Sequence, residues 1–218
     1  MDEGTSIYRE IEREQNKEQR KNEIISIAKK MFIEKGYNKS TMSDIAKEAK
    51  ISRKTLYRYY NSKEEIALEI EISAFKVYIE YQKDVLKNLK GNGFNKLSTY
   101  LKNMDNIIDD FKELIVFTGF FDNYFIDDYP ETNATKEFIE LIEISNRPIN
   151  ELIEEGMKDG SIRNDINSLY VANTISNSIL AMSQRVYTRY QHLNDEQHID
   201  ARKMISCQIE LFLNGIKQ

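Results

Sequence analysis

A cluster of basic residues near the start of the chain is suited to binding a polyanion. Between Lys39 and Lys63, seven lysines and arginines stand against two acids, which gives this stretch a net charge of +5. Residues 64–218 hold 16 basic and 26 acidic groups, a balance of −10, although the net charge of the whole chain is only −5. Because a phosphate backbone attracts positive surface, any nucleic-acid interface is expected in the first part of the chain.

The segment 52–60 carries hydrogen-bond donors that could meet duplex DNA. It reads SRKTLYRYY, in which Leu56 can anchor a helix in a core while the polar side chains face outward. Guanidinium, ammonium and hydroxyl groups can donate both to phosphate oxygens and to base edges. The outward donors are Arg53, Lys54, Thr55, Tyr57 and Arg58.

Short helices are expected to position these donors. Apolar residues over 24–32 recur at i, i+3, i+4 and i+7, which predicts a helix packed on a core. Thr41 and Ser52 are typical capping residues and predict helices over 42–49 and 53–59 with a tight turn between them. This order of helices is that of a helix-turn-helix, whose last helix enters the major groove.

The rest of the chain also has helical periodicity and no strand-like alternation, so the expected fold class is all-α. Ser62 and Glu65 have capping-box spacing and should open a long helix that is interrupted at residues 91–93. Pro148 should kink or restart a helix, because it lacks an N–H and crowds the preceding turn. The further helices are expected over 94–110, 111–127, 131–157, 165–189 and 195–217.

The stretch 24–69 also contains an ordered set of short motifs. It reads IISIAKKMFIEKGYNKSTMSDIAKEAKISRKTLYRYYNSKEEIALE, with Ala and Phe, Gly-Tyr, Thr, Asp-Ile-Ala, Thr-Leu-Tyr and Ser-Lys-Glu in sequence. In this it resembles the TetR family of bacterial transcriptional regulators, over about one fifth of the chain. Lys50 and Lys54 depart from the family pattern, which often has Gly, another small residue or Pro at those positions.

The resemblance implies an N-terminal three-helix helix-turn-helix domain followed by a larger helical ligand-binding and dimerisation domain. We place the first domain at 21–66 and the second at 67–218, after an N-terminal extension at 1–20. The extension holds four basic and six acidic groups, which would make a poor arm for the minor groove. We expect it to be a frayed helix or disordered.

Carried over position by position, the resemblance implies two kinds of contact with double-stranded operator DNA. Phosphate contacts are expected from Thr41, Tyr57 and Lys63, and Lys63 opens a helix whose N-terminus favours anions. The alternative for each of these residues, and for those facing the bases, is a solvated surface group. Base-edge contacts are expected from Ser43, Arg53, Lys54 and Thr55, while Tyr59 could make either kind.

Aromatic residues are plentiful in the expected ligand-binding domain. The resemblance makes some of them the lining of a pocket for a small hydrophobic or aromatic effector, between the helix that opens at Ser62 and the segment 111–125. Packing in a solid core is the alternative. The expected lining residues are Tyr78, Tyr81, Phe111, Phe117, Phe120, Phe121 and Tyr124.

Two stripes of apolar residues near the C-terminus repeat at positions 0, 4, 7 and 11 and indicate helix packing. The resemblance assigns the last two long helices to a homodimer interface, which a protein reading twofold-related half-sites requires. The alternative is a core within one chain. The stripes are Ile175, Ile179, Met182 and Val186, and Ile205, Ile209, Phe212 and Ile216.

Several classes of site find no support in the sequence. Cys207 is the single cysteine, and His192 and His198 are too far apart for an i, i+4 metal pair, so no metal is expected. Gly-rich phosphate loops, nucleophile elbows and His-Glu-x-x-His motifs are lacking, so we expect no catalysis and no cofactor. The sequence has no apolar run of membrane length and no leader, so we expect no membrane partner. The expected location is the cytoplasm.

Together these features favour a DNA-binding repressor, dimeric and not an enzyme, whose operator affinity is altered by a small-molecule effector. The alternative is a ligand-independent DNA-binding or scaffold protein whose acidic C-terminal domain holds a protein partner. An open cavity among the aromatic residues would favour the first, and a solid core with a large exposed apolar patch the second.

Overall fold

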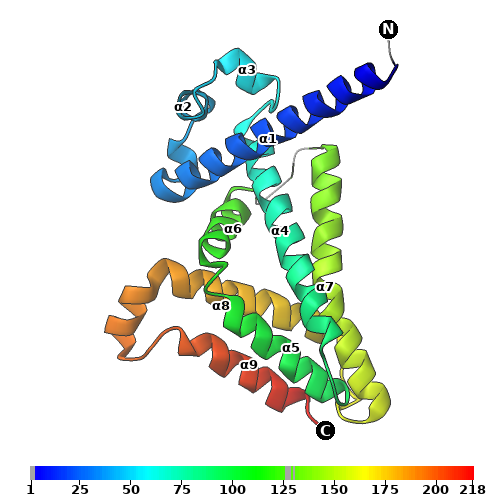
Figure 1. The fold of residues 1–218 in the computed structure, drawn as a ribbon. Helices are drawn as coiled ribbons and strands as arrows, with labels where there is room; N and C mark the ends of the chain where they lie inside the picture. Colours follow the sequence, from blue (N-terminus) through cyan, green and yellow to red (C-terminus); the bar gives the residue numbers. More distant parts are fainter. Residues whose placement is uncertain (1–2, 126–128, 130) are drawn as a thin grey trace. The chain divides into compact units, whose positions relative to one another are not determined.

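The computed structural model describes residues 3–125, 129 and 131–218, and these residues are helical almost throughout (Figure 1). The only β pairing within the described part is a single bridge between Ile162 and Lys217, which confirms the all-α class. No helix among the described residues is long and apolar enough to cross a membrane. The chain divides into two compact units, formed by the described residues of Met1–Ile70 with Pro130–Ala134 and of Glu71–Tyr129 with Thr135–Gln218.

The N-terminal unit has a small apolar core, to which each short helix contributes the side chains of one face. Phe32, Ile45, Leu56 and Ile66 are fully buried in it. Burying side chains of this size typically stabilises a fold by about 1.5–3 kcal/mol each. The elements of this unit are α1 (Glu3–Lys35), the short 3₁₀ helix η1 (Tyr37–Lys39), α2 (Met42–Glu48), α3 (Arg53–Tyr57) and the start of α4 (Lys63–Lys87).

Helix α1 begins at Glu3, so residues 3–20 continue the helix of the DNA-binding unit. The sequence explains this, because Glu, Lys, Arg and Gln are good helix formers and dominate the segment 9–20. Exposed ion pairs three residues apart, Lys17 with Glu14 at 3.0 Å and Arg20 with Glu23 at 2.7 Å, add modest support. The alternative of disorder is thus wrong for residues 3–20, which are helical.

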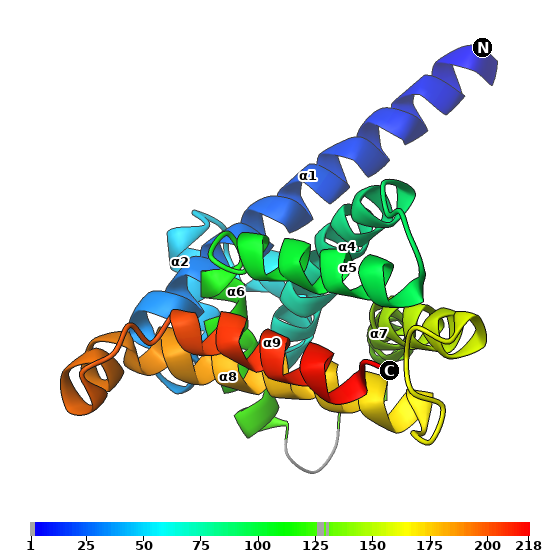
Figure 2. The same ribbon diagram turned by 90° about the horizontal axis from the view of Figure 1, so that it is seen from below.

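The C-terminal unit combines the second part of α4 with five further helices. Figures 1 and 2 show α8 and α9 running side by side, and α6 and α5 pack on them in turn. Its core contains Leu97, Tyr100, Ile153, Ile175 and Ile205, all of them fully buried. The additional elements are α5 (Gly93–Ile107), α6 (Lys112–Tyr124), α7 (Asn133–Asp159), α8 (Ser168–Gln197) and α9 (Lys203–Ile216).

Two expected helix boundaries in the C-terminal unit were wrong, the start of α8 and the start of the last helix. Of the two outcomes expected at Pro148, a kink or a restart, the restart does not occur, because α7 runs through this residue. Helix α8 is capped by Asn167, whose side chain accepts from the Tyr170 N–H. It is kinked at Arg189, where the expected helix ended, and a second helical segment reaches Gln197. Residues expected to open the last helix therefore belong to α8, which ends where His198 adopts a left-handed conformation with φ of 54°.

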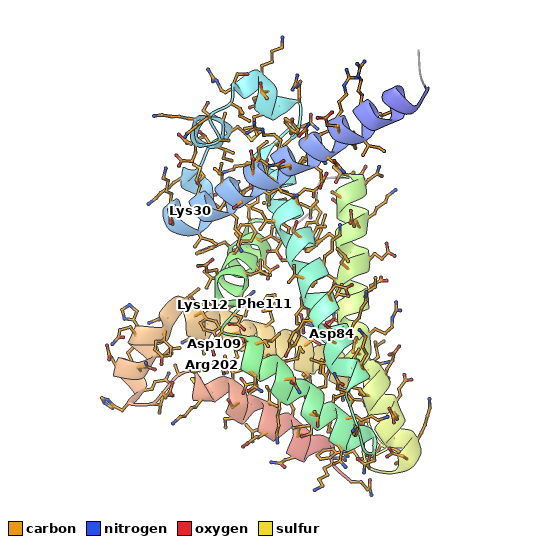
Figure 3. All side chains as sticks on the ribbon, in the orientation of Figure 1. Lys30, Asp84, Asp109, Phe111, Lys112 and Arg202 are labelled. Atoms are coloured by element: carbon orange, nitrogen blue, oxygen red, sulfur yellow. The ribbon has the colours of Figure 1, made fainter. Side chains whose placement is uncertain are left out.

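Arg202 at the start of α9 ties that helix to the end of α5 (Figure 3). Its guanidinium donates to Asp105 at 2.6 Å and to Asp109 at 3.1 Å. Tyr187 on α8 also donates to Asp109, at 2.6 Å, and Ser206 donates to Asp105 at 2.7 Å. Burial opposes ionisation, but the hydrogen bonds from Tyr187 and Arg202 hold the pKa of Asp109 below its ordinary value. This network joins three helices with charge-assisted hydrogen bonds.

The N-terminus of α5 lies directly on the backbone of α7. A Cβ added to Gly93 would stand 2.1 Å from the backbone nitrogen of Gly156, so only glycine fits at this crossing. The free amides at this end of α5 are occupied by α7 and its following loop, because the Gly93 N–H donates to Asp159 at 2.6 Å and the Phe94 N–H to Ser161 at 3.0 Å. Hydrogen bonds from Ser161 and Gly93 lower the pKa of Asp159.

Gly93→Ala is expected to destabilise the protein, because a methyl group at this crossing must push two backbones apart. Overpacking of this kind typically costs about 1–3 kcal/mol in the free energy of unfolding. Gly215→Ala in α9 is the matched control, since nothing lies within 4 Å of a Cβ added there and alanine favours helix. Urea unfolding of both variants measures the difference; equal stability of the two would contradict the proposed crossing.

Candidate nucleic-acid interface

The turn between α2 and α3 sets the angle of the two helices. The Ile51 N–H donates to the Ala46 carbonyl at 3.0 Å and the Lys50 N–H to the Lys47 carbonyl at 3.1 Å, the pattern of a helix that ends on a left-handed residue. Lys50 is that residue, with φ of 54°, a conformation that usually falls to glycine. Its exposed side chain therefore stands at a position where a bare backbone is common.

Thr41 caps α2 in a reciprocal arrangement with Asp44. The Thr41 hydroxyl accepts from the Asp44 N–H at 3.2 Å and donates to the Asp44 carboxylate at 2.6 Å, which also accepts from the Thr41 N–H. These bonds from Thr41 lower the pKa of Asp44. The hydroxyl has a single proton, so Thr41 can donate it to a phosphate only by releasing Asp44.

The start of α3 brings together the residues expected to face base edges. Ser52 caps the helix by accepting from the Thr55 N–H at 3.0 Å, and the hydroxyls of Ser52 and Thr55 lie 2.8 Å apart. Arg53 donates to the Ser43 hydroxyl of α2 at 3.3 Å, so these two predicted residues share one exposed surface. Lys54 is exposed beside them. Leu56 on the opposite side is fully buried, as its anchoring role required.

The three tyrosines at positions 57, 59 and 60 differ in how deeply they are buried. Tyr57 is half exposed at 50%, and Tyr59 is half-buried. Tyr60 is buried, and burial raises the pKa of its phenol. Tyr57 and Tyr59 therefore remain accessible to a ligand, whereas Tyr60 belongs to the core.

The amine of Lys63 is directed into the protein. It donates to the backbone carbonyls of Tyr37 at 3.1 Å and Ser40 at 3.4 Å, and it lies 4.1 Å from the centroid of the Tyr37 ring. Lys63 thus fastens α4 to η1 through a hydrogen-bonded cation over an aromatic face. The expected cap of α4 is present in part, because the Ser62 hydroxyl accepts from the Glu65 N–H, while the Glu65 carboxylate accepts from Asn61.

One basic surface was not singled out from the sequence. Arg13, Lys17 and Arg20 lie along α1 and line a groove whose wall also includes Tyr59. Their spacing of four and three residues is the signal that places them on one helix face. Counting charge over the whole segment 1–20 concealed it, because the acids of that segment are interleaved in the sequence.

The residues expected to line an effector pocket fall into separate groups in the C-terminal unit. Tyr78 and Phe111 meet edge to face at 6.1 Å, and burial raises the pKa of Tyr78 to about 12. Tyr81 donates to the Asn103 carbonyl at 3.4 Å. Phe117 and Phe121 are buried and neighbour each other at 6.4 Å, whereas Phe120 and Tyr124 are each more than 40% exposed.

Phe121 is the centre of an aromatic cluster in which rings pack on rings. Its centroid lies 4.6 Å from that of Phe125, 5.9 Å from Tyr129 and 5.5 Å from Phe138. Phe75 of α4 contacts Phe138 at 5.6 Å. Two hollows on the described residues run along α1, and neither is lined by residues of this cluster.

Most residues of the two C-terminal stripes are buried inside a single chain. Their apolar faces pack α8 and α9 onto the rest of the C-terminal unit, which matches the alternative of an intramolecular core. Buried side chains cannot also form the surface that a second chain meets. The fully or nearly fully buried members are Ile175, Val186, Ile205, Ile209 and Ile216, and the partly buried ones are Ile179, Met182 and Phe212.

Residues 24–70 match the family model for bacterial regulatory proteins of the tetR family. The chain is 27% identical over 211 residues to the HTH-type transcriptional regulator QacR of Staphylococcus aureus, covering 91% of this chain and 98% of that protein. It is also 34% identical over 74 residues to the regulator HbdR of Aromatoleum sp., covering 34% of this chain and 31% of that protein.

Solved structures share the fold at lower identity. The regulator FadR of Bacillus subtilis, in complex with stearoyl-CoA, superposes with a TM-score of 0.67 at 20% identity over 89% of this chain and 98% of that one. KstR2 of Mycobacterium tuberculosis gives a TM-score of 0.65 at 18% identity over 91% and 95% of the two chains. With the helix-turn-helix formed by α2 and α3, these likenesses lead to one assignment: residues 24–70 are a DNA-binding domain of the tetR family, and the chain is a DNA-binding transcriptional regulator.

Proposed function

We propose that this regulator is a homodimeric repressor that reads operator DNA with α3 and loses or gains operator affinity when a small effector binds in the C-terminal unit. The observation that carries the DNA-binding part is the exposed surface shared by Arg53, Ser43 and Lys54 above the buried anchor Leu56. Recognition helices place their first residues against base edges in the major groove. Arg53 and Lys54 are the first two residues of α3.

We assign base readout to Ser43, Arg53, Lys54 and Thr55 and phosphate binding to Thr41, Tyr57 and Lys63, with Tyr59 able to do either. The contacts within the protein rank these assignments. Arg53 and Lys54 can meet a base with little rearrangement, whereas Thr41 and Lys63 must first exchange the bonds described above. The Lys63 side chain is therefore proposed mainly to hold α4 against η1, with phosphate binding as its second role.

Dimerisation is assigned to the outward face of α8 and α9. Several large apolar side chains remain exposed there in one chain: Tyr170 is 77% exposed, Leu211 67% and Leu169 60%. Contiguous exposed apolar patches are typical of association surfaces, and we infer that these side chains belong to one. The buried stripes that include Ile209 support this face from behind by fixing α8 and α9 in place. Dimerisation would present two copies of α3 to twofold-related half-sites.

The effector site is assigned to the aromatic cluster around Phe121. Apolar rings with a few polar groups are the usual lining of a small-molecule site. Thr118 and Glu71 supply such groups, since the Thr118 hydroxyl donates to the buried Glu71 carboxylate at 3.2 Å. Burial raises the pKa of Tyr129 in the same cluster, and Asp122 and Glu71 raise it further. The similar regulator FadR was solved with stearoyl-CoA, a ligand with a long apolar chain.

Helix α4 supplies the coupling in this proposal. It contains both Lys63, fastened to η1, and Glu71 and Phe75, which contact the proposed effector site. An effector that prefers one position of α4 changes the operator affinity only by the difference between its affinities for the two positions. By linkage, operator DNA changes the effector affinity by the same factor.

The packing of Phe121 against its neighbours favours a second candidate, a DNA-binding protein without an effector that holds a protein partner through its C-terminal unit. In that case the aromatic cluster is core and the exposed face of α8 and α9 is the docking surface. Effector binding at the cluster requires rings such as Phe121 to move apart, which is the physical difference between the two candidates.

Arg53→Ala is expected to reduce discrimination between operator and random duplex. Loss of a bidentate contact with guanine typically costs about 1–3 kcal/mol at the contacted base pair and leaves phosphate binding intact. Binding titrations with an operator selected from random-sequence duplexes, and with a scrambled duplex, measure the two affinities. An equal loss on both duplexes would make Arg53 a phosphate ligand only.

Lys63→Met is expected to lower the free energy of unfolding, because it removes hydrogen bonds from a charged group to the Tyr37 and Ser40 carbonyls. Such bonds are typically worth about 1.5–3 kcal/mol each. Thermal unfolding without DNA tests this structural role, and the salt dependence of DNA binding tests the phosphate role. Unchanged stability with a reduced salt slope would show that Lys63 acts on DNA alone. Lys54→Met, on the exposed surface of α3, is the control for loss of one cation.

Phe121→Ala is expected to weaken the response to an effector more than it weakens DNA binding without one. A binder of the cluster raises the melting temperature and shifts operator affinity by a coupling energy of about 1–3 kcal/mol. Stearoyl-CoA and an anilinonaphthalene dye are suitable first probes, and Phe120→Ala, at a half-exposed neighbour, is the control. If both variants respond like the parent to a compound that shifts operator affinity, its site lies elsewhere.

A further inference from the structure

The N-terminal half of α1 has its charges sorted onto two faces. Arg13, Lys17 and Arg20 follow one another at four and three residues, and Arg9 continues the row one turn earlier. Glu10, Glu14 and Glu18 form a separate row displaced to one side around the helix, and Glu12 lies on the other side of the basic residues. The segment is nearly neutral in total but presents a continuous basic face, named here the α1 basic row and defined as Arg13, Lys17 and Arg20.

The α1 basic row lies next to Tyr59, which follows α3 in the chain. All three of its side chains line one groove with Tyr59, which comes two residues after the end of α3. The Tyr59 phenol is close enough to Lys17 to contribute to raising its pKa, after the larger effects of Glu14. In Figure 1 the N-terminal half of α1 extends beyond α3 within the same unit. The row thus adjoins Tyr59, one of the residues assigned to DNA binding.

The existing partners of these cations are weak competitors for a phosphate. Lys17 and Arg20 pair with acids three residues away, at 3.0 and 2.7 Å, and all four side chains are about half exposed or more. Exposed pairs of this kind are worth about 0–1 kcal/mol. Exchange of Glu14 or Glu23 for a DNA phosphate therefore costs little, and counterion release from the duplex favours it.

The length of the row matches several backbone charges. Arg13 and Arg20 are separated by seven residues, about 10 Å at 1.5 Å per residue. Duplex DNA carries one negative charge for about every 1.7 Å of its axis, so a phosphate lies within reach of each side chain. The residues offer flexible cations and no fixed array of base-reading donors, which suits backbone binding without sequence preference.

We propose that the α1 basic row binds the phosphate backbone of duplex DNA flanking the site read by α3, and so extends the operator footprint beyond the helix-turn-helix. This inference rests on the DNA-binding function proposed above and adds a contact surface to it. The N-terminal extension is then part of the interface, although its summed charge argued against such a role.

The test removes the three charges together and compares two duplex lengths. The variant Arg13→Gln/Lys17→Gln/Arg20→Gln is compared with Lys21→Gln/Lys29→Gln/Lys30→Gln, which removes the same charge from other faces of the same helix. One duplex holds only the operator core selected by the wild-type protein, and the other adds flanking sequence on both sides. Affinities are measured over a range of salt concentrations, and helical content and melting temperature are recorded for each variant.

On the long duplex, the row variant is expected to bind at least about tenfold more weakly at low salt, with a salt slope smaller by about 2–3 per chain. On the core duplex, the row and control variants are expected to bind alike. Equal affinity and equal slope for the two variants on the long duplex would overturn the proposal. If the wild-type protein selects no duplex at all, the DNA-binding function itself fails, an outcome distinct from the loss of the flanking contact alone.

Discussion

The burial of Leu56 in the core of the N-terminal unit is the interaction on which the DNA interface depends. Helix α3 has five residues, too few to be stable alone, because helix nucleation is unfavourable and short helices in water do not persist. It forms because Leu56 is fully buried and because the Ser52 hydroxyl accepts a hydrogen bond from the Thr55 N–H in its first turn. The position of Leu56 therefore sets the direction in which every exposed donor of α3 points. A recognition surface of this kind is rigid only to the extent that the small core beneath it is packed.

The start of α4 is likewise fixed by a few contacts. Lys63, Glu65 and Tyr37 join the end of the helix-turn-helix to a helix that continues into the C-terminal unit. One polar cluster therefore defines where α4 begins, and the C-terminal unit holds its later residues, including Gln82, which donates to the Tyr100 hydroxyl at 2.6 Å and to the Ser145 carbonyl at 2.9 Å. Allosteric control needs such an element with contacts at both ends.

The sequence predicted well what depends on local signals and less well what depends on distant packing. Caps and periodicity placed α2 and α3 within two residues, because Thr41 and Ser52 act within one helical turn. The boundary near residue 165 was missed because Asp165 and Asn167 are both good caps, and only the tertiary environment selects Asn167. The stripe of Ile205 and Ile209 was visible, but periodicity alone cannot tell whether the partner is the same chain or a second copy.

The contact between Gly93 and Gly156 has a mechanical consequence. Two helices that touch through side chains can shift relative to each other while rotamers adjust, whereas backbones in direct contact have no such compliant layer. At this crossing α5 and α7 must therefore move as a single rigid lever. Compliance in the C-terminal unit is left to layers of long side chains, such as the aromatic rings around Phe121, which can adjust their rotamers.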